Sequence, residues 1–293
     1  MLLISKIGTA IFIPVSIGLS LVFLLFKHNR PNAPLLLALA YGLGLGILSQ
    51  WMLLLAATNV YFHLSTIGLP ILGAASLVMC FVIRKSGSGP TLIKKQSPNN
   101  KFSPDIITIL ISAYIIFHLL YIFWTAFNIP VHVWDEIERV AFKAKFFSID
   151  RSIKQLKYLP HPSYPLLVEF VITWITLNLQ LWNDQIIKMI IPLFFLSYAV
   201  MHFSLLRNFT DTKWALGGVA LLIASPLLIH HATIVYADLP LMFYNCGTII
   251  LLLLWNIKRA DSYLIMASLF AGLASFTKVE GVFYFAIYFI LLI

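Results

Sequence analysis

Charged side chains are scarce in this sequence. Only 11% of its 293 residues are Asp, Glu, Lys or Arg, while 60% are apolar. A soluble domain of this size would lack the polar residues needed to cover its surface, so the composition excludes an ordinary soluble protein. The chain contains several apolar runs of about 20 residues, the length that an α-helix needs to cross a bilayer. We therefore expect an integral membrane protein.

Cysteine is also nearly absent. Cys80 and Cys246, the only two, lie in apolar runs and indicate neither a disulfide framework nor a thiolate metal site. The adjacent His230 and His231 would point about 100° apart on a helix, which favours polar interfacial residues over metal ligands. No metal site is predicted. The net charge of +9 is spread over short clusters between apolar runs, so it does not indicate nucleic-acid binding.

The apolar runs predict an all-α polytopic fold with about nine transmembrane helices. The expected spans are 7–26, 33–57, 65–83, 105–127, 186–206, 214–232, 237–257, 262–277 and a last one that begins near 279. This last run reaches Ile293 without a polar end, which predicts a truncated polypeptide. A basic linker rich in Gly, Ser and Pro, from Arg84 to Ser103, separates an N-terminal three-helix unit with its linker (1–103) from a larger transmembrane core (104–293). Gly42, Gly44 and Gly46 form a small-residue stripe that predicts close helix packing.

Residues 164–182 are apolar enough to span, yet they carry Glu169, Asn178 and Gln180. If this stretch does not span, the loops that hold 11 of the 20 Lys and Arg residues all fall on the same side of the membrane. The positive-inside rule identifies the side with the excess of Lys and Arg as the cytoplasm. We therefore predict that 164–182 lies in or dips into the outer interface. It would belong to one long external segment, from Asn128 to about Gln185, that contains interfacial helices.

Three predicted outer loops carry ionisable groups, which are rare and costly near a membrane. The first loop contains Asp135, Glu136, Arg139 and Lys143. The second contains Asp238, and the third contains Lys278 and Glu280. Each loop has a simpler explanation: solvated charges on an amphipathic interfacial helix over 131–147, a helix cap at Asp238, and a local ion pair at Lys278. The stretch from His161 to Pro165 would by itself be only a turn.

In combination, these motifs resemble the GT-C class of polyprenyl-phosphate-sugar glycosyltransferases. The resemblance covers roughly 104–293 and rests on Trp134-Asp-Glu136, His161-Pro-Ser-Tyr-Pro165, Tyr236-Ala-Asp-Leu-Pro-Leu241 and Gly272-Leu-Ala-Ser-Phe-Thr-Lys-Val-Glu-Gly281. Protein mannosyltransferases that use dolichyl-phosphate mannose and bacterial lipid A aminoarabinose transferases are the nearest groups. The histidine motif departs from their His-Pro-Pro, and three additional spans precede the core.

The resemblance implies an inverting hexosyl- or pentosyltransferase that moves a sugar from a polyprenyl-phosphate donor to a hydroxyl of a glycan, lipid or protein acceptor. It implies that Asp135 is the catalytic base, with Glu136 as the adjacent competitor, and that Lys278 holds the donor phosphate. The other candidate substrate-binding residues are Arg139, Lys143, His161, Tyr164, Asp238 and Glu280. No cofactor is predicted besides the donor itself. The expected location is the bacterial inner (plasma) membrane, among its lipids, with the active site on the periplasmic or external side.

Two other functions compete with this interpretation. A transporter or flippase of a lipid-linked saccharide would use the same charges to line a passage, but it should carry charges at the bilayer midplane and an inverted repeat. The sequence shows no repeat, and its charges gather at one interface. A non-catalytic scaffold would leave the clustered carboxylates and lysines unexplained.

The topology makes a testable prediction about the ends of 164–182. Single cysteines introduced at Ser163 and Asn183 should both react with a membrane-impermeant maleimide added from the outer side, because the stretch between them does not cross the bilayer. Labelling of the two positions from opposite sides would overturn the topology and, with it, a site shared by the three loops.

Overall fold

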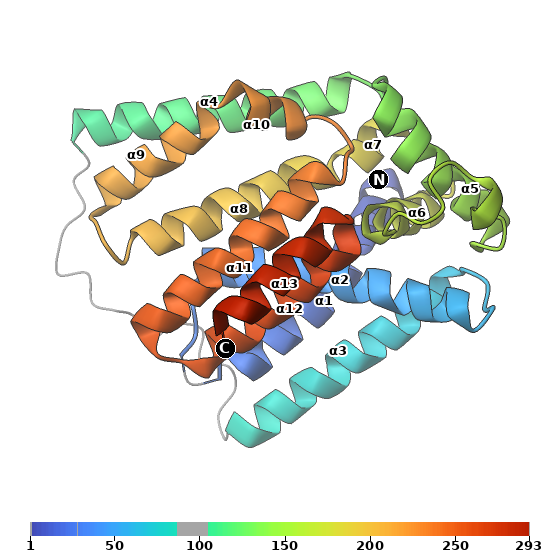
Figure 1. Cartoon of the computed structure of the whole chain (residues 1–293), viewed down its shortest axis with the longest axis horizontal. Coiled ribbons are helices and arrows are strands. Elements are labelled where there is room, and N and C mark those ends of the chain that lie inside the picture. Colours follow the sequence, from blue (N-terminus) through green and yellow to red (C-terminus); the bar gives the residue numbers. More distant parts are fainter. Residues whose placement is uncertain (1, 28, 87–104, 293) are drawn as a thin grey trace.

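The computed structural model describes residues 2–27, 29–86 and 105–292, and this part of the chain is helical without any strand (Figure 1). The longer helices are α1 (Leu2–Leu25), α2 (Ala33–Ala57), α3 (Leu64–Ser86), α4 (Ile106–Asn128), α8 (Ile190–Leu206), α11 (Asp238–Lys258), α12 (Asp261–Thr277) and α13 (Glu280–Leu292). The shorter elements are the π-helix η1 (Glu136–Ala141), α5 (Phe142–Asp150), the 3₁₀-helix η2 (Leu156–Tyr158), α6 (Leu167–Leu179), α7 (Asp184–Lys188), α9 (Thr212–Ile223) and α10 (Pro226–His231).

Six helical stretches in the described residues are long and apolar enough to cross a membrane. They are 3–25, 33–57, 64–85, 106–128, 184–206 and 238–258. This finding is compatible with the membrane protein expected from composition. The predicted span 214–232 is instead two helices, α9 and α10, because Ser225 is extended and Pro226 begins a new helix. The remaining predicted spans correspond to α12 and α13, which are shorter than these six stretches. The linker prediction falls mostly on 87–103, outside the described residues.

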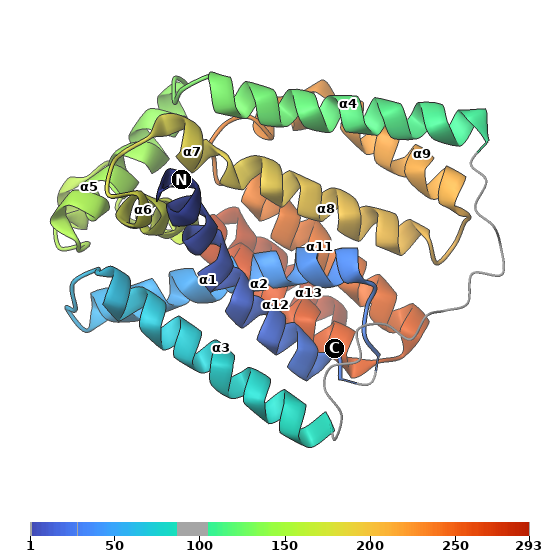
Figure 2. The same cartoon turned by 180° about the vertical axis from the view of Figure 1, so that it is seen from behind.

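The connections between the long helices gather at two ends of the bundle, as both views show (Figures 1 and 2). At one end, called here the basic end, Lys27 Nζ donates to the carbonyl of Lys85 over 2.9 Å, and Lys213 Nζ lies 2.7 Å from Asp105 Oδ2. The α8–α9 and α11–α12 connections lie at this end too. The opposite end, called the site end, holds η1, α5, α6 and the α2–α3, α10–α11 and α12–α13 connections.

Helix α6 lies across the site end. It is seen almost end-on in Figure 1, whereas the long helices lie in the plane of the view. Its 13 residues would extend only about 20 Å, less than the roughly 30 Å of a hydrocarbon core. The indole N–H of Trp174 donates to the carbonyl of Ala10, and Lys6 Nζ donates to the carbonyl of Leu179. Helix α6 is therefore tied to α1. That 164–182 does not span stays a prediction, because α12 and α13, which are expected to span, are also shorter than the six stretches.

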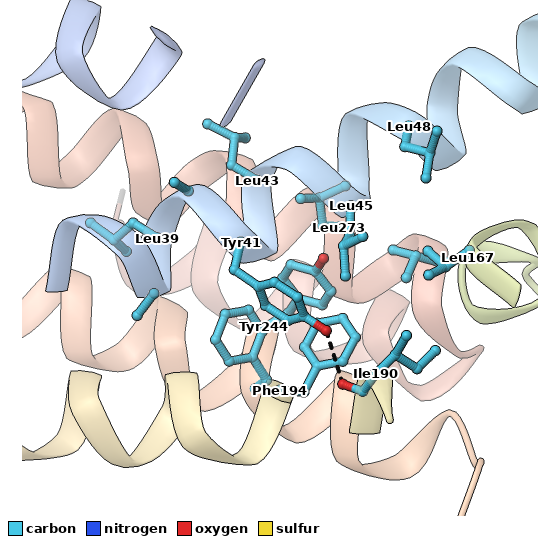
Figure 3. Close-up of a cluster of buried hydrophobic side chains, with 14 of the residues drawn as sticks. Leu39, Tyr41, Leu43, Leu45, Leu48, Leu167, Ile190, Phe194, Tyr244 and Leu273 are labelled. Carbon is cyan, nitrogen blue, oxygen red and sulfur yellow. Dashed lines mark hydrogen bonds between the residues drawn. The ribbon is translucent and has the colours of Figure 1, made fainter. Parts of the chain in front are cut away.

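Helix α2 occupies the centre of the bundle and packs against α1, α6, α8 and α12. Figure 3 shows the aromatic cluster at this centre. Tyr41 donates its hydroxyl to the carbonyl of Ile190 over 2.9 Å, and Tyr244 donates to the carbonyl of Gly42 over 2.8 Å. Both rings meet Phe194 edge-on. Described residues of both expected units, 1–103 and 104–293, thus belong to one hydrophobic cluster.

The glycine stripe of α2 has the packing role that the sequence predicts. A Cβ on Gly44 would overlap the carbonyl of Pro14 in α1, and a Cβ on Gly18 would overlap the carbonyl of Ala40. Without side chains at these positions, the backbones of α1 and α2 approach each other directly.

A glycine substitution tests this close approach. Gly44→Ala should destabilise the protein by about 1–3 kcal/mol, because the added methyl group must push two backbones apart. The matched control is Gly73→Ala in α3, where nothing lies within 4 Å of the new Cβ. The control should be neutral or slightly stabilising, since alanine favours helix. Thermal unfolding in detergent measures both, and equal melting temperatures for the two variants would contradict the packing argument.

Candidate functional site

A cavity lies at the site end, where four separate segments of the chain meet. Its polar lining residues are Asp135, Arg139, Tyr164, Glu169, Tyr236, Asp238, Thr277 and Lys278. They come from the start of η1, the stretch leading into α6, the α10–α11 connection and the end of α12. The cavity has a volume of about 40 Å³, room for roughly three water molecules. Five of the residues singled out in the sequence are therefore brought together.

The π-helix η1 presents two of these residues. Its wider turn is shown by the N–H of Phe142, which donates to the carbonyl of Ile137 five residues earlier. Asp135 and Arg139 both line the cavity, and the guanidinium Nε lies 3.2 Å from a carboxylate oxygen of Asp135. Single π turns inside helices frequently occur at functional sites.

Glu136 is placed differently from its neighbour Asp135. Its side chain is 0% exposed, and it does not line the cavity. One oxygen accepts from the backbone N–H of Val235 over 2.6 Å and lies 3.4 Å from Lys188 Nζ. The other oxygen accepts from the backbone N–H groups of His132 and Val133. Because its acceptor sites are engaged away from the cavity, Glu136 holds the fold here, and Asp135 remains as the candidate base.

Lys278 is held between two carboxylates. Its Nζ lies 2.8 Å from Asp238 and 3.2 Å from Glu280. Burial lowers the pKa of Lys278, but the hydrogen bonds and charges of Asp238 and Glu280 outweigh burial and raise it above its ordinary value. Ala237 occupies the N-cap position of α11 and no side chain caps that helix, so helix capping does not account for Asp238. Glu280 contacts Lys278 without lining the cavity.

Lys143 and His161 lie behind the cavity wall. The buried Lys143 Nζ is 3.0 Å from Glu169 and donates to the carbonyl of His161 over 3.4 Å. The imidazole of His161 stacks on the ring of Tyr164, with centroids 5.0 Å apart. Arg139 and Lys143 both lie within 6 Å of the Tyr164 ring centroid, close enough for cation–π attraction. Lys143 and His161, both predicted to bind substrate, therefore support Tyr164 and Glu169 instead of lining the cavity.

Glu169 and Tyr236 line the cavity but were not among the predicted site residues. Glu169 is 4% exposed, and burial raises the pKa of its carboxyl although Lys143 opposes the shift. The pKa of Tyr236 is also raised, by burial and by the surrounding negative charges of Asp135, Glu136 and Asp238. The sequence carried a signal for Glu169, because it is the one acidic residue in the apolar stretch 164–182.

Within the ranges that the structure describes, no group of three or more His, Cys, Asp or Glu residues is placed to hold a metal ion. Scans of the chain against profiles of known families, against characterised proteins and against solved structures found no significant match. The fold and the site define an all-α protein with long apolar helices and a charged cavity at one end of the bundle.

The different environments of Asp135 and Glu136 predict different effects on stability. Glu136→Ala should cost about 3–5 kcal/mol, because it leaves Lys188 buried without its charge partner and removes the acceptor of three backbone N–H groups. Asp135→Asn should cost less than about 1 kcal/mol, since the Asp135 ion pair is part-exposed. Thermal unfolding in detergent compares them, and similar destabilisation by both substitutions would contradict the assignment of Glu136 to the fold.

Proposed function

We propose that this protein is an inverting membrane glycosyltransferase that moves a sugar from a polyprenyl-phosphate donor to an acceptor hydroxyl. The observation that carries the proposal is the cavity itself, because it gathers two part-exposed carboxylates, Asp135 and Asp238, each with its own cation. Such a reaction needs a base for the acceptor proton and positive charge beside the leaving phosphate. The order of the sequence motifs supports the same conclusion.

In the proposed reaction, the acceptor oxygen attacks the anomeric carbon from the face opposite the phosphate. The bond from that carbon to the phosphate oxygen breaks, and polyprenyl phosphate leaves with the bonding electrons. Asp135 takes the acceptor proton, while Lys278 and Arg139 stabilise the charge on the phosphate. In the free protein these two cations neutralise Asp238 and Asp135. A bound phosphate would compete for both cations, which frees the Asp135 carboxylate to act as a base.

The surroundings of the cavity suit a lipid-linked substrate. With room for roughly three water molecules, the cavity is smaller than a sugar phosphate, so part of the sugar and the whole polyprenyl chain would lie outside it. Val282 and Phe283 follow Lys278 closely in the chain and are 54% and 68% exposed, which gives an apolar surface beside the phosphate-binding ammonium. Exposed aromatic residues at the site end, such as Trp134 and Tyr158, are typical of a membrane interface.

The proposed topology places the basic end in the cytoplasm and the site end outside, in agreement with the positive-inside rule. In this arrangement the six long stretches each cross the membrane once. Three further crossings, made by α9 together with α10, by α12 and by α13, bring the number to about nine. Residues 128–185 form the external segment that carries η1, α5 and α6. The active site would then face the periplasmic or external side of a bacterial inner membrane.

Paired substitutions test the proposed roles. Asp135→Asn should lower transfer by about 10²–10⁴-fold with donor binding retained, because the amide keeps the shape but cannot accept the proton. Lys278→Ala should weaken both donor binding and turnover, since the phosphate is charged in the ground state and in the transition state. Transfer is measured in isolated membranes with radiolabelled polyprenyl-phosphate sugars, and donor binding with the purified protein.

Asp150→Asn and Lys157→Ala are matched controls, because both residues lie in the same external segment without lining the cavity. They should retain activity. Near-normal turnover of Asp135→Asn would remove its role as base, and a wild-type protein that transfers none of the sugars would refute the proposed function.

A further inference from the structure

The proposed reaction does not use Glu169, although this carboxylate lies in the cavity wall. It belongs to the first turn of α6 and is almost completely buried. Burying an ion pair is a poor way to stabilise a fold, because the loss of hydration offsets most of the attraction between the charges. The oxygens of Glu136, the other buried carboxylate here, are engaged away from the cavity by Lys188 and three backbone N–H groups. Glu169 instead lines the cavity, and this position points to a ligand.

The geometry leaves part of this carboxylate available to a ligand. Lys143 reaches Oε1 of Glu169 over 3.0 Å, and it does so from behind the wall, since it is fully buried and does not line the cavity. A carboxylate has two oxygens and about four acceptor positions, so one ammonium does not exhaust it. Glu169 lines the cavity, so an acceptor position that Lys143 does not use can serve a ligand there.

The neighbours of Glu169 fit a sugar better than a phosphate. Tyr164 and Tyr236 line the same cavity, and a phenol hydroxyl can donate to or accept from the hydroxyl groups of a sugar. A phosphate would be repelled by the carboxylate, and it has Lys278 and Arg139 as partners. The hydroxyl or amino groups of a sugar, in contrast, are hydrogen-bond donors that a carboxylate accepts.

We propose that Glu169 accepts a hydrogen bond from a hydroxyl or amino group of the sugar carried by the donor. Glu169 is thus a specificity-determining residue whose ligand is the sugar and not the phosphate. The inference rests on the proposed function for the identity of the donor. In this arrangement Lys143 positions the Glu169 carboxylate.

Equilibrium binding to the purified full chain separates sugar recognition from phosphate recognition. The probes are polyprenyl phosphate without a sugar and the same lipid carrying mannose or arabinose. The test variants are Glu169→Gln, which keeps the side-chain shape, and the double variant Lys143→Met/Glu169→Met, which leaves no unpaired charge in the wall. The control is Asp150→Asn, which changes a carboxylate at the end of α5 that does not border the cavity.

The wild type should bind at least one sugar-bearing lipid more tightly than the bare lipid. The double variant should lose about 10- to 100-fold in affinity for that sugar-bearing lipid, the effect of a hydrogen bond to a charged acceptor. Its affinity for the bare lipid should stay within about twofold of the wild type. Glu169→Gln should lose less, because its amide oxygen still accepts. Lys278→Ala should weaken the binding of both probes, and Asp150→Asn should leave both affinities unchanged.

Two results would overturn the inference. One is a double variant that keeps the wild-type preference for the sugar-bearing lipid, or that loses affinity for both probes equally. The other is a wild type that gains no affinity from either sugar. A turnover assay on the same samples tests the function separately: binding of the sugar-bearing lipid that depends on Glu169, without any transfer, would refute the glycosyltransferase and leave the sugar site standing.

Discussion

The arrangement of the site depends on the buried carboxylate of Glu136. It accepts backbone N–H groups from two separate parts of the chain, His132 and Val133 before η1 and Val235 before α11, and it pairs with Lys188 of α7. Removing these groups from water is costly unless every one of them is paired. The polar contacts therefore fix the α10–α11 connection against η1, which sets Asp238 and Asp135 around one cavity.

The ion pairs at the site end fall into two kinds with different physical consequences. The pairs of Lys188 with Glu136 and of Lys143 with Glu169 are buried, so neither partner can exchange its contact for water. The pairs Asp135–Arg139 and Lys278–Asp238 keep between 23% and 43% of their side-chain surface exposed. Water or a charged ligand can replace a partner in the second kind at small cost. The buried pairs hold the walls, while the exposed pairs supply groups that are able to change partners.

Much of the fold could be predicted from local sequence patterns. Apolar runs of sufficient length locate most of the long helices. The break between α9 and α10 was missed although Ser225-Pro226 marks it, because the apolar composition continues through the break. Hydropathy measures how apolar a stretch is, but it does not detect a change of direction inside that stretch.

A residue of the cavity could be predicted from the sequence only where its place relative to a helix end indicates that it lies near the cavity. Asp238 and Lys278 were found because each stands at the boundary of a long helix. Asp135 and Glu136 are indistinguishable by that criterion, and only the fold shows that one borders the cavity while the other is buried. The Lys143–Glu169 pair joins residues 26 positions apart, and no local pattern reports such a contact.

Helix α6 gives the N-terminal unit a physical connection to the site. Glu169 and Pro165 border the cavity, while Trp174 on the same helix donates to the carbonyl of Ala10 in α1. Ser49 of α2 donates to the carbonyl of Leu167 at the other end of α6. Neighbouring helices hold α6 in position and direction, and α1 and α2 provide those contacts. Helices α1 and α2 are therefore structural support for the cavity wall, since Glu169 can line the cavity only while α6 stays across the end of these two helices.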